Sequence, residues 1–253
     1  MIKPLKKTWN KAFKKLTFAN SYMISASMKN KETFGPIKNM YTGKDLVLCG
    51  AGPSLNKYRK IEGAVHFALN RAILYEKVHF DYMIADDWDG INFIQDKIEQ
   101  YDCQKFFGHQ IGNYEREIPE SFVIKCNAQR YYTDSFMVED GFASSLVCDI
   151  DCRAIGNMAN IAMSAMQILL FTNPKKIYIV ACDASSGHYT QNGVSEERRK
   201  QHEKDLKLAV YGNRVISVWN DIKAFAKAFY PDTEIISVNP VGLKGIFKDI
   251  YQE

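Results

Sequence analysis

The sequence predicts an α/β fold, a Rossmann-like and mostly parallel sheet with helices on both faces. Short apolar runs alternate with helix-like segments from about residue 44 onward, as in βαβ units. The 253 residues, 46% of them hydrophobic, suffice for one large core. A glycine-rich turn follows the first apolar run. We expect a single domain over residues 41–253, preceded by an extension over residues 1–40.

The strands are expected where the apolar runs lie. These runs are Leu46–Cys49, Val65–Leu69, Tyr82–Ala85, Lys105–Phe107, Phe122–Lys125, Ile177–Cys182 and Glu234–Val238. In a parallel sheet the ligand crevice lies beyond the carboxyl ends of the strands, so the residues that follow these runs matter most.

Three helical segments follow from the patterning. Residues 157–172 are apolar almost all round, which predicts a buried helix with Asn157 as its N-cap and Pro174 after its end. Residues 220–229 predict a helix capped by Asn220 or Asp221. The highly charged residues 195–210 predict an exposed helix or a lid, within a lid-like segment near 187–212.

The extension is strongly basic. Residues 1–31 contain eight lysines and no acidic residue, and a helix there would place Leu5, Trp9 and Phe13 on one face. This pattern is typical of a helix lying on an anionic membrane surface. An arm that packs its aromatic residues on the domain is the alternative. A nucleic-acid arm is disfavoured, because the rest of the chain has no basic stripe.

The cysteines and the hydropathy suggest a compartment. No apolar run approaches the ~20 residues that span a bilayer, and no continuous apolar segment follows the basic N-terminus. Three of the six cysteines end strand-like runs, and Cys148 and Cys152 lack a second ligand pair at zinc-site spacing. We expect a cytoplasmic protein, which a membrane-binding extension would hold peripherally on the inner face of the membrane.

The first candidate binding element is the turn Gly50-Ala51-Gly52-Pro53-Ser54, with Asn70 at the end of the next run. Glycines let backbone N–H groups approach a phosphate closely, and Asn both donates and accepts. The alternative is a tight turn without a ligand. The third glycine of the dinucleotide fingerprint is replaced by Leu55, and no P-loop lysine follows, which counts against an NAD enzyme or a Walker-type ATPase.

Two further segments carry candidate residues. Gly156 and Asn157 stand at the start of the buried helix, where free N–H groups favour an anion, although a simple cap explains them equally well. The most apolar run leads into a polar segment that is either a site or a hydrogen-bonded loop. It contains Asp183, Ser185, His188 and Tyr189.

Three carboxylates at Asp86, Asp87 and Asp89 are compatible with Mg²⁺ or with a helix cap, and the cap is favoured. The other histidines, His66, His79, His109 and His202, are not expected to be catalytic.

Taken in their order along the chain, these motifs resemble those of a bacterial sialyltransferase family that uses CMP-sialic acid. They are also similar to the related Maf-type flagellin-modifying proteins and the archaeal-type (MptE-like) pterin pyrophosphokinases. The shared pattern is Gly-x-Gly-Pro-Ser-Leu (Gly50–Leu55), a strand ending in Asn70, a glycine-led helix from Gly156, a strand ending in Asp183, and Asn220-Asp221-Ile222-Lys223 before a strand ending in Asn239-Pro240. The resemblance covers roughly residues 44–245.

The resemblance implies that the glycine turn and Asn70 hold a cytidine nucleotide and that Tyr189 contacts the leaving phosphate. The family places its histidine base before the Asn-Asp-Ile-Lys segment, but residues 214–219 contain none. Either His188 acts as the base instead, or the donor and acceptor differ from those of the family. Asp183 is a candidate to orient a nucleophile or bind a metal. Ser185 is a second candidate phosphate donor.

The expected function is transfer of an acidic sugar, of the sialic acid or Kdo type, from a CMP-activated donor to a glycan or glycolipid acceptor. No cofactor is required. One alternative is a pterin-type pyrophosphokinase that uses Mg²⁺ and ATP with Asp86, Asp87 and Asp183. The other is a non-catalytic nucleotide- or glycan-binding protein.

Overall fold

The computed structural model describes residues 24, 26–110, 117–134, 137–138, 141–142, 146–156, 160–184, 189–190, 195–197, 200 and 209–252. The main strands are β1 (Asp45–Cys49), β2 (Val65–Leu69), β3 (Tyr82–Ala85), β4 (Gln104–Gln110), β5 (Gln129–Asp134), β8 (Ile155–Gly156), β9 (Lys176–Val180), β10 (Glu234–Val238) and β11 (Lys248–Ile250). Two short strands, β6 (Met137–Val138) and β7 (Gly141–Phe142), form a separate antiparallel pair.

The helices alternate with these strands along the chain. They are α2 (Gln95–Gln100), α3 (Glu120–Lys125), α4 (Ile161–Phe171) and α6 (Ala209–Phe229). Short 3-10 turns add η1 (Gly35–Ile37), η2 (Pro53–Lys57), η3 (Asn70–Leu74), η4 (Trp88–Gly90) and η5 (Asn92–Ile94).

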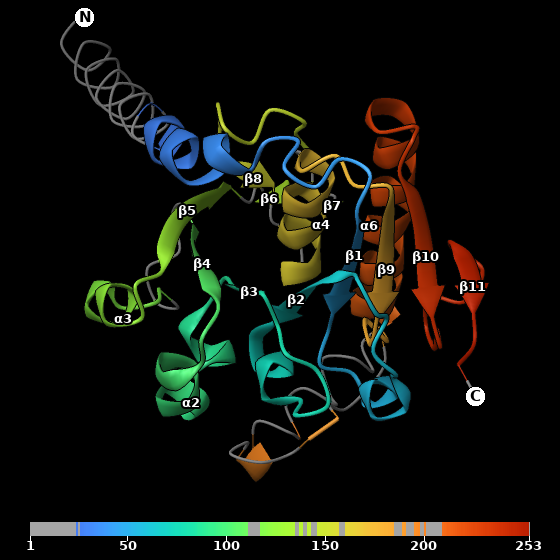
Figure 1. The fold of residues 1–253 in the computed structure, drawn as a ribbon, viewed down its shortest axis with the longest axis horizontal. Helices are drawn as coiled ribbons and strands as arrows, with labels where there is room; N and C mark the ends of the chain where they lie inside the picture. The colour runs from blue at the N-terminus through green and yellow to red at the C-terminus, as the bar shows by residue number, and fades with distance from the viewer. Residues whose placement is uncertain are drawn as a thin grey trace, which may run out of the picture.

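The main sheet has nine strands in the order β11-β10-β9-β1-β2-β3-β4-β5-β8, and every neighbouring pair is parallel (Figure 1). This confirms the predicted α/β fold. After β1 the chain continues to β2 on one side, while β9 lies on the other side. In open parallel sheets a reversal of strand order of this kind opens a crevice beyond the carboxyl ends.

Alternation along the strands divides the core into two layers. Leu46 and Leu48 of β1 pack with α4 and α6, whereas Val47 and Cys49 pack with η5, α2 and α3 on the other face. Because both faces are covered, the strands are apolar on both sides.

The predicted buried helix corresponds to α4, whose residues are buried from Ala162 to Phe171. Its N-cap is Asn160, whose Oδ1 accepts the N–H of Ala162 at 2.9 Å. The predicted cap, Asn157, lies outside the described residues. Thr172 closes the helix shortly before Pro174, as expected.

Two predicted elements are wrong. Phe122–Lys125 lies in helix α3, because Phe122 and Val123 are buried while Ile124 is 72% exposed, a pattern that a strand buried on both faces would not give. Asn220 and Asp221 do not cap a helix but lie within α6. There the apolar face of Val215, Trp219 and Ile222 continues without interruption.

Three strands of the sheet were not predicted. β5 contains mostly polar residues, and β8 and β11 have only two and three residues, so none of them presents an apolar run.

The residues before β1 join the domain. Residues 26–34 are helical, and Phe34 and Ile37 belong to the core beneath β1 and β2. The Nδ2 of Asn30 donates to the carbonyls of Tyr132 and Arg153, at 3.2 and 2.8 Å. Residues 30–37 of the predicted extension are therefore anchored on the sheet.

Within the part of the chain that the structure describes, no helix combines the length and the apolar character needed to cross a bilayer. All six cysteines are described, and all six are free thiols.

Candidate functional site

The glycine turn lies at the carboxyl end of β1, against the segment that follows β9. The N–H of Gly50 donates to Val180 O at 2.8 Å, and the N–H of Gly52 donates to Ala181 O at 2.9 Å. These two N–H groups are therefore held by protein acceptors, and they do not point to a phosphate as the sequence suggested.

Close approach of this segment explains the two glycines. A Cβ on Gly50 would stand 2.5 Å from Ala181 O, and a Cβ on Gly52 would stand 2.4 Å from Asp183 Oδ2. The approaching backbone is strained, because Ala181 and Ala184 have φ angles of +53° and +46°, a region that alanine rarely adopts. Strain of this kind often accompanies a functional site.

Asp183 fixes the turn. Its carboxylate accepts the N–H of Ser54 at 2.8 Å and the hydroxyl of Ser54 at 2.5 Å, and the Asp183 side chain is buried. Its carbonyl accepts the N–H of Gly242 at 2.8 Å. Asp183 therefore joins the ends of β1 and β9 to the segment after β10, and both carboxylate oxygens are engaged there.

Tyr189 returns to the same turn. Its N–H donates to Ala51 O at 2.9 Å, its hydroxyl donates to Arg71 O at 3.1 Å, and its carbonyl accepts Asn56 Nδ2 at 3.3 Å. Burial raises the pKa of the Tyr189 hydroxyl, which stays protonated at neutral pH. The structure thus brings together the glycine turn, Asp183 and Tyr189, as the sequence predicted.

Asn70 directly follows β2 and has a left-handed conformation, with φ +49°. A Cβ on Gly90 would stand 3.0 Å from Asn70 Nδ2, so the amide lies directly against η4. The carbonyl oxygen, Asn70 Oδ1, is buried and accepts no hydrogen bond among the described residues. A buried acceptor without a donor is costly, and a ligand donor would remove that cost.

Of the remaining predicted site residues, the structure describes only Gly156, and it does not lie at this turn. Gly156 belongs to β8, the fifth strand from β1 in the sheet order, and its carbonyl accepts Gln167 Nε2 at 2.8 Å. Asn157, Ser185 and His188 lie outside the described residues, as does most of the predicted lid near 187–212.

The acidic residues of the Mg²⁺ alternative are engaged separately. Asp183 accepts hydrogen bonds from Ser54, and Asp87 caps η4 by accepting the N–H of Gly90 at 2.6 Å. Asp86 accepts a hydrogen bond from the hydroxyl of Ser164. The predicted capping role is therefore confirmed for Asp87. No group of three metal-ligating side chains occurs among the described residues.

Asp86 is buried directly after the end of β3. Its carboxylate accepts the hydroxyl of Tyr131 and, at 3.0 Å, the hydroxyl of Ser164 from α4. Burial raises the pKa of Asp86 to about 7, although the two hydroxyls oppose the shift. Sequence patterns could not predict this cluster, because its members are 33 to 78 residues apart.

Sequence reasoning also missed two residues at the carboxyl edge. Arg71 directly follows Asn70, is buried, and places its guanidinium 4.7 Å from the ring centre of Phe93. His109, near the end of β4, has its Nδ1 2.7 Å from Glu117 Oε1, the arrangement by which a carboxylate orients an imidazole. The signal for Arg71 was its position beside a strand-end asparagine.

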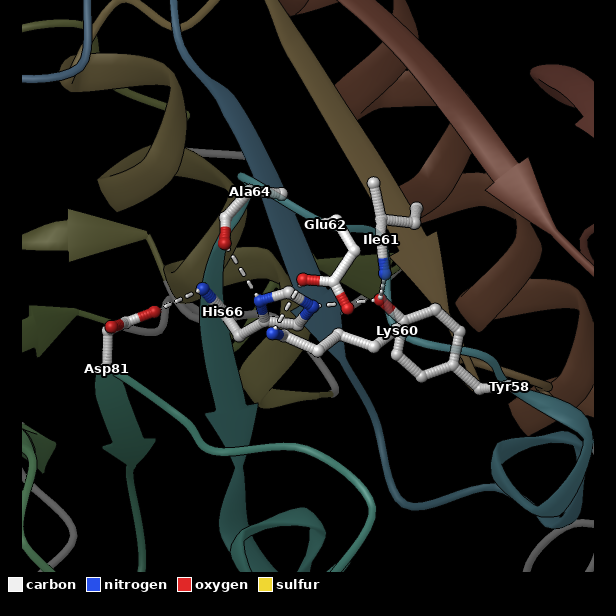
Figure 2. Close-up of polar contacts among 7 residues, drawn as sticks. All are labelled: Tyr58, Lys60, Ile61, Glu62, Ala64, His66 and Asp81. Carbon is white, nitrogen blue, oxygen red and sulfur yellow. Dashed lines mark hydrogen bonds and ion pairs between the residues drawn. The ribbon is translucent and has the colours of Figure 1, made fainter.

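His66 has a structural role, as expected. Figure 2 shows its imidazole between Tyr58 and Ala64, with Nε2 2.9 Å from the Tyr58 hydroxyl and Nδ1 3.0 Å from Ala64 O. Its backbone N–H donates to Asp81 at 2.8 Å. Burial lowers the pKa of His66, so the ring is neutral, and it lies near the amino end of β2, away from the glycine turn.

No protein-family model and no curated protein matches this chain. Among solved structures, the chain is similar to the sialyltransferase CstII from Campylobacter jejuni in complex with the substrate analogue CMP-3FNeuAc, at 12% identity and a TM-score of 0.46. It is also similar to the sialyltransferase CST-II in complex with a trisaccharide acceptor and CMP, at 11% identity and the same TM-score. Each match covers 77% of this chain and 80% of the other chain. A likeness at this TM-score assigns no function to this chain.

Proposed function

We propose that this chain is a glycosyltransferase that moves an acidic sugar, of the sialic acid or Kdo type, from a CMP-activated donor to a surface glycan. The observation that carries the proposal is the buried Oδ1 of Asn70, which accepts no hydrogen bond from the described part of the chain. It lies beside the glycine turn, at the carboxyl edge of a parallel sheet. The order of motifs from Gly50 to Asn239, which resembles the CMP-sialic acid-dependent family, supports the choice of nucleotide.

In this proposal Asn70 binds the cytidine. Its Oδ1 accepts a ribose hydroxyl or the cytosine amino group, both of which are donors. The turn from Gly50 to Ser54, including Ala51 and Pro53, shapes one wall of the cleft. Gly50 and Gly52 act through their lack of a side chain, because their N–H groups are already bonded to β9 and the segment that follows it.

The reaction exchanges one C–O bond for another. The acceptor hydroxyl oxygen attacks the anomeric carbon, the bond to the phosphate oxygen breaks, and CMP leaves with the electron pair. His188 takes the hydroxyl proton, and Tyr189 and Ser185 donate hydrogen bonds to the departing phosphate. Asp183 positions the Ser54 turn instead of touching the substrate. This scheme needs neither a metal nor a cofactor.

A thermal-shift panel of CMP, CDP, UDP, GDP, ATP and NAD, each with and without Mg²⁺, tests the nucleotide. We expect CMP to raise the Tm without Mg²⁺, because a ligand that binds only the folded state stabilises it by mass action. A shift from ATP that requires Mg²⁺, with none from CMP, would instead favour the pterin-type pyrophosphokinase.

Turnover is tested separately by release of CMP from CMP-sialic acid and CMP-Kdo. His188→Ala should lower this rate by about 10²–10⁴-fold while keeping the CMP-induced rise in Tm. Release at the wild-type rate by this variant would remove His188 from the mechanism.

We also propose that the basic segment before the domain holds the protein on an anionic membrane, near a lipid-linked acceptor. In the full chain, changing Lys7, Lys11 and Lys14 to Glu should abolish binding to vesicles that contain anionic lipid, since each lysine near such a surface contributes about 1 kcal/mol. Unchanged vesicle binding would discard the membrane proposal and leave the transferase proposal standing.

A further inference from the structure

A groove with a volume of about 1010 Å³ opens on the face of the sheet that α2 covers. One side is formed by the chain that leaves η3, from Ile73 to His79, and the other side is formed by η5 and α2. Tyr189 and Thr190 also line it.

Tyr189 connects the groove to the glycine turn. Its backbone is bonded to Ala51, its hydroxyl is bonded to Arg71 O, and its ring meets the ring of Tyr75 edge-on at 5.8 Å. The same residue therefore contacts the proposed donor edge and forms a wall of the groove. A molecule in the groove would lie beside the donor.

The groove has an aromatic lining. Tyr75, Phe93, Tyr101 and Tyr189 contribute rings, and the imidazole of His79 stacks on Tyr101 at 5.6 Å. Sugar rings carry apolar C–H faces that pack on aromatic faces, while their hydroxyl groups require polar partners. Aromatic rings combined with polar groups therefore suit a carbohydrate.

The charges at the groove are balanced. Glu76 and Asp96 supply carboxylates, and Lys77 and Lys97 supply ammonium groups; all four residues are exposed. Carboxylates accept hydrogen bonds from sugar hydroxyls and ammonium groups donate to them. A polyphosphate or a nucleic acid would instead require a clear excess of positive charge.

The size of the groove indicates more than one sugar. Pockets for single small molecules usually enclose about 300–1,000 Å³, and this groove lies at the top of that range. Its lining runs from Tyr189, at the carboxyl edge, to Tyr101, which precedes β4 at the amino edge.

We propose that this groove binds an oligosaccharide of two or more sugars, and that it holds the acceptor chain of the proposed transferase. The role as acceptor site rests on the proposed function, whereas binding of an oligosaccharide does not.

The test is binding of the full-length protein to an immobilised panel of glycans from one to five sugars. Wild type should bind at least one oligosaccharide, and more tightly than the monosaccharides. The double variant Lys77→Ala/Asp96→Ala should bind the same glycan at least tenfold more weakly. Both side chains are exposed, so the fold should tolerate the change.

The matched control is Lys227→Ala/Asp232→Ala, which removes one exposed charge of each sign at α6 and the turn after it. It should bind the glycan as wild type does. No binding to any glycan, equal binding of monosaccharides, or equal loss in both double variants would overturn the proposal.

The CMP-induced rise in Tm separates this inference from the proposed function. If the Lys77→Ala/Asp96→Ala variant loses glycan binding but keeps the CMP shift, both ideas stand. If glycan binding depends on the groove but CMP never shifts the Tm, the groove is a glycan site and the transferase proposal fails.

Discussion

At the residue scale, the glycine turn packs closely against the segment that follows β9. The approach of Ala181 and Asp183 to Gly50 and Gly52 leaves no room for a Cβ, and Asp183 binds Ser54 through both carboxylate oxygens. The sequence predicted which residues gather here, but it could not show that their N–H groups are used internally. That fact depends on the register between β1 and β9.

Gly52→Ala tests this packing. We expect it to lower the free energy of unfolding by about 3 kcal/mol, because one of the atoms it would meet is the backbone oxygen of Ala181, which cannot swing away. Gly63→Ala is the control: nothing lies within 4 Å of the Cβ that it would add, and only the positive φ of Gly63, +75°, opposes alanine. We expect a cost of about 1 kcal/mol there. Equal costs in urea unfolding would contradict the crowding argument.

Asp86 predicts a pH dependence. Its folded pKa of about 7 lies above its unfolded value, so the folded state binds the proton more tightly. This group therefore stabilises the fold fully below about pH 4, and the stabilisation is lost as the pH rises to about 7. Relative to Asp86→Asn, wild type should lose stability over this interval in urea unfolding. A constant difference between the two proteins would show that the Asp86 carboxyl is not perturbed.

At the element scale, apolar runs were sufficient to predict six of the strands. Apolar runs did not predict a strand made of polar residues, and they did not distinguish a short helix from a strand. β5 is polar and is held by its neighbours β4 and β8, whereas the apolar run of α3 is too short to separate strand from helix. The sequence placed the N-cap of the buried helix at the first asparagine of Asn157-Met-Ala-Asn160, but the structure uses the second.

Asn160→Ala should destabilise the fold by about 1 kcal/mol, because the N–H of Ala162 loses its acceptor at the start of α4. Asn220→Ala is a matched control, since Asn220 is exposed within α6 and alanine favours a helix interior. Thermal unfolding compares the two variants. A larger loss of stability for Asn220→Ala than for Asn160→Ala would indicate that a helix begins at Asn220, as the sequence predicted, and not at Ala209.

At the scale of the whole molecule, the reversal of strand order at β1 determines where chemistry can occur. It brings the ends of β1, β2 and β9 to one edge, and Tyr189 joins that edge to the groove over α2. The sequence predicted the edge from the ends of its apolar runs. It could not predict the groove, because the lining residues come from three separate segments and share no motif.

The most direct test of the account is calorimetric titration of CMP into wild type, Asn70→Gly and Asn173→Gly. Both asparagines have a positive φ, which glycine adopts without strain, but Asn173 follows α4 at the opposite edge of the sheet. We expect Asn70→Gly to bind CMP about tenfold more weakly, the loss of one hydrogen bond, and Asn173→Gly to bind as wild type does. Equal affinity in all three proteins, or no binding to wild type, would contradict a cytidine site at Asn70.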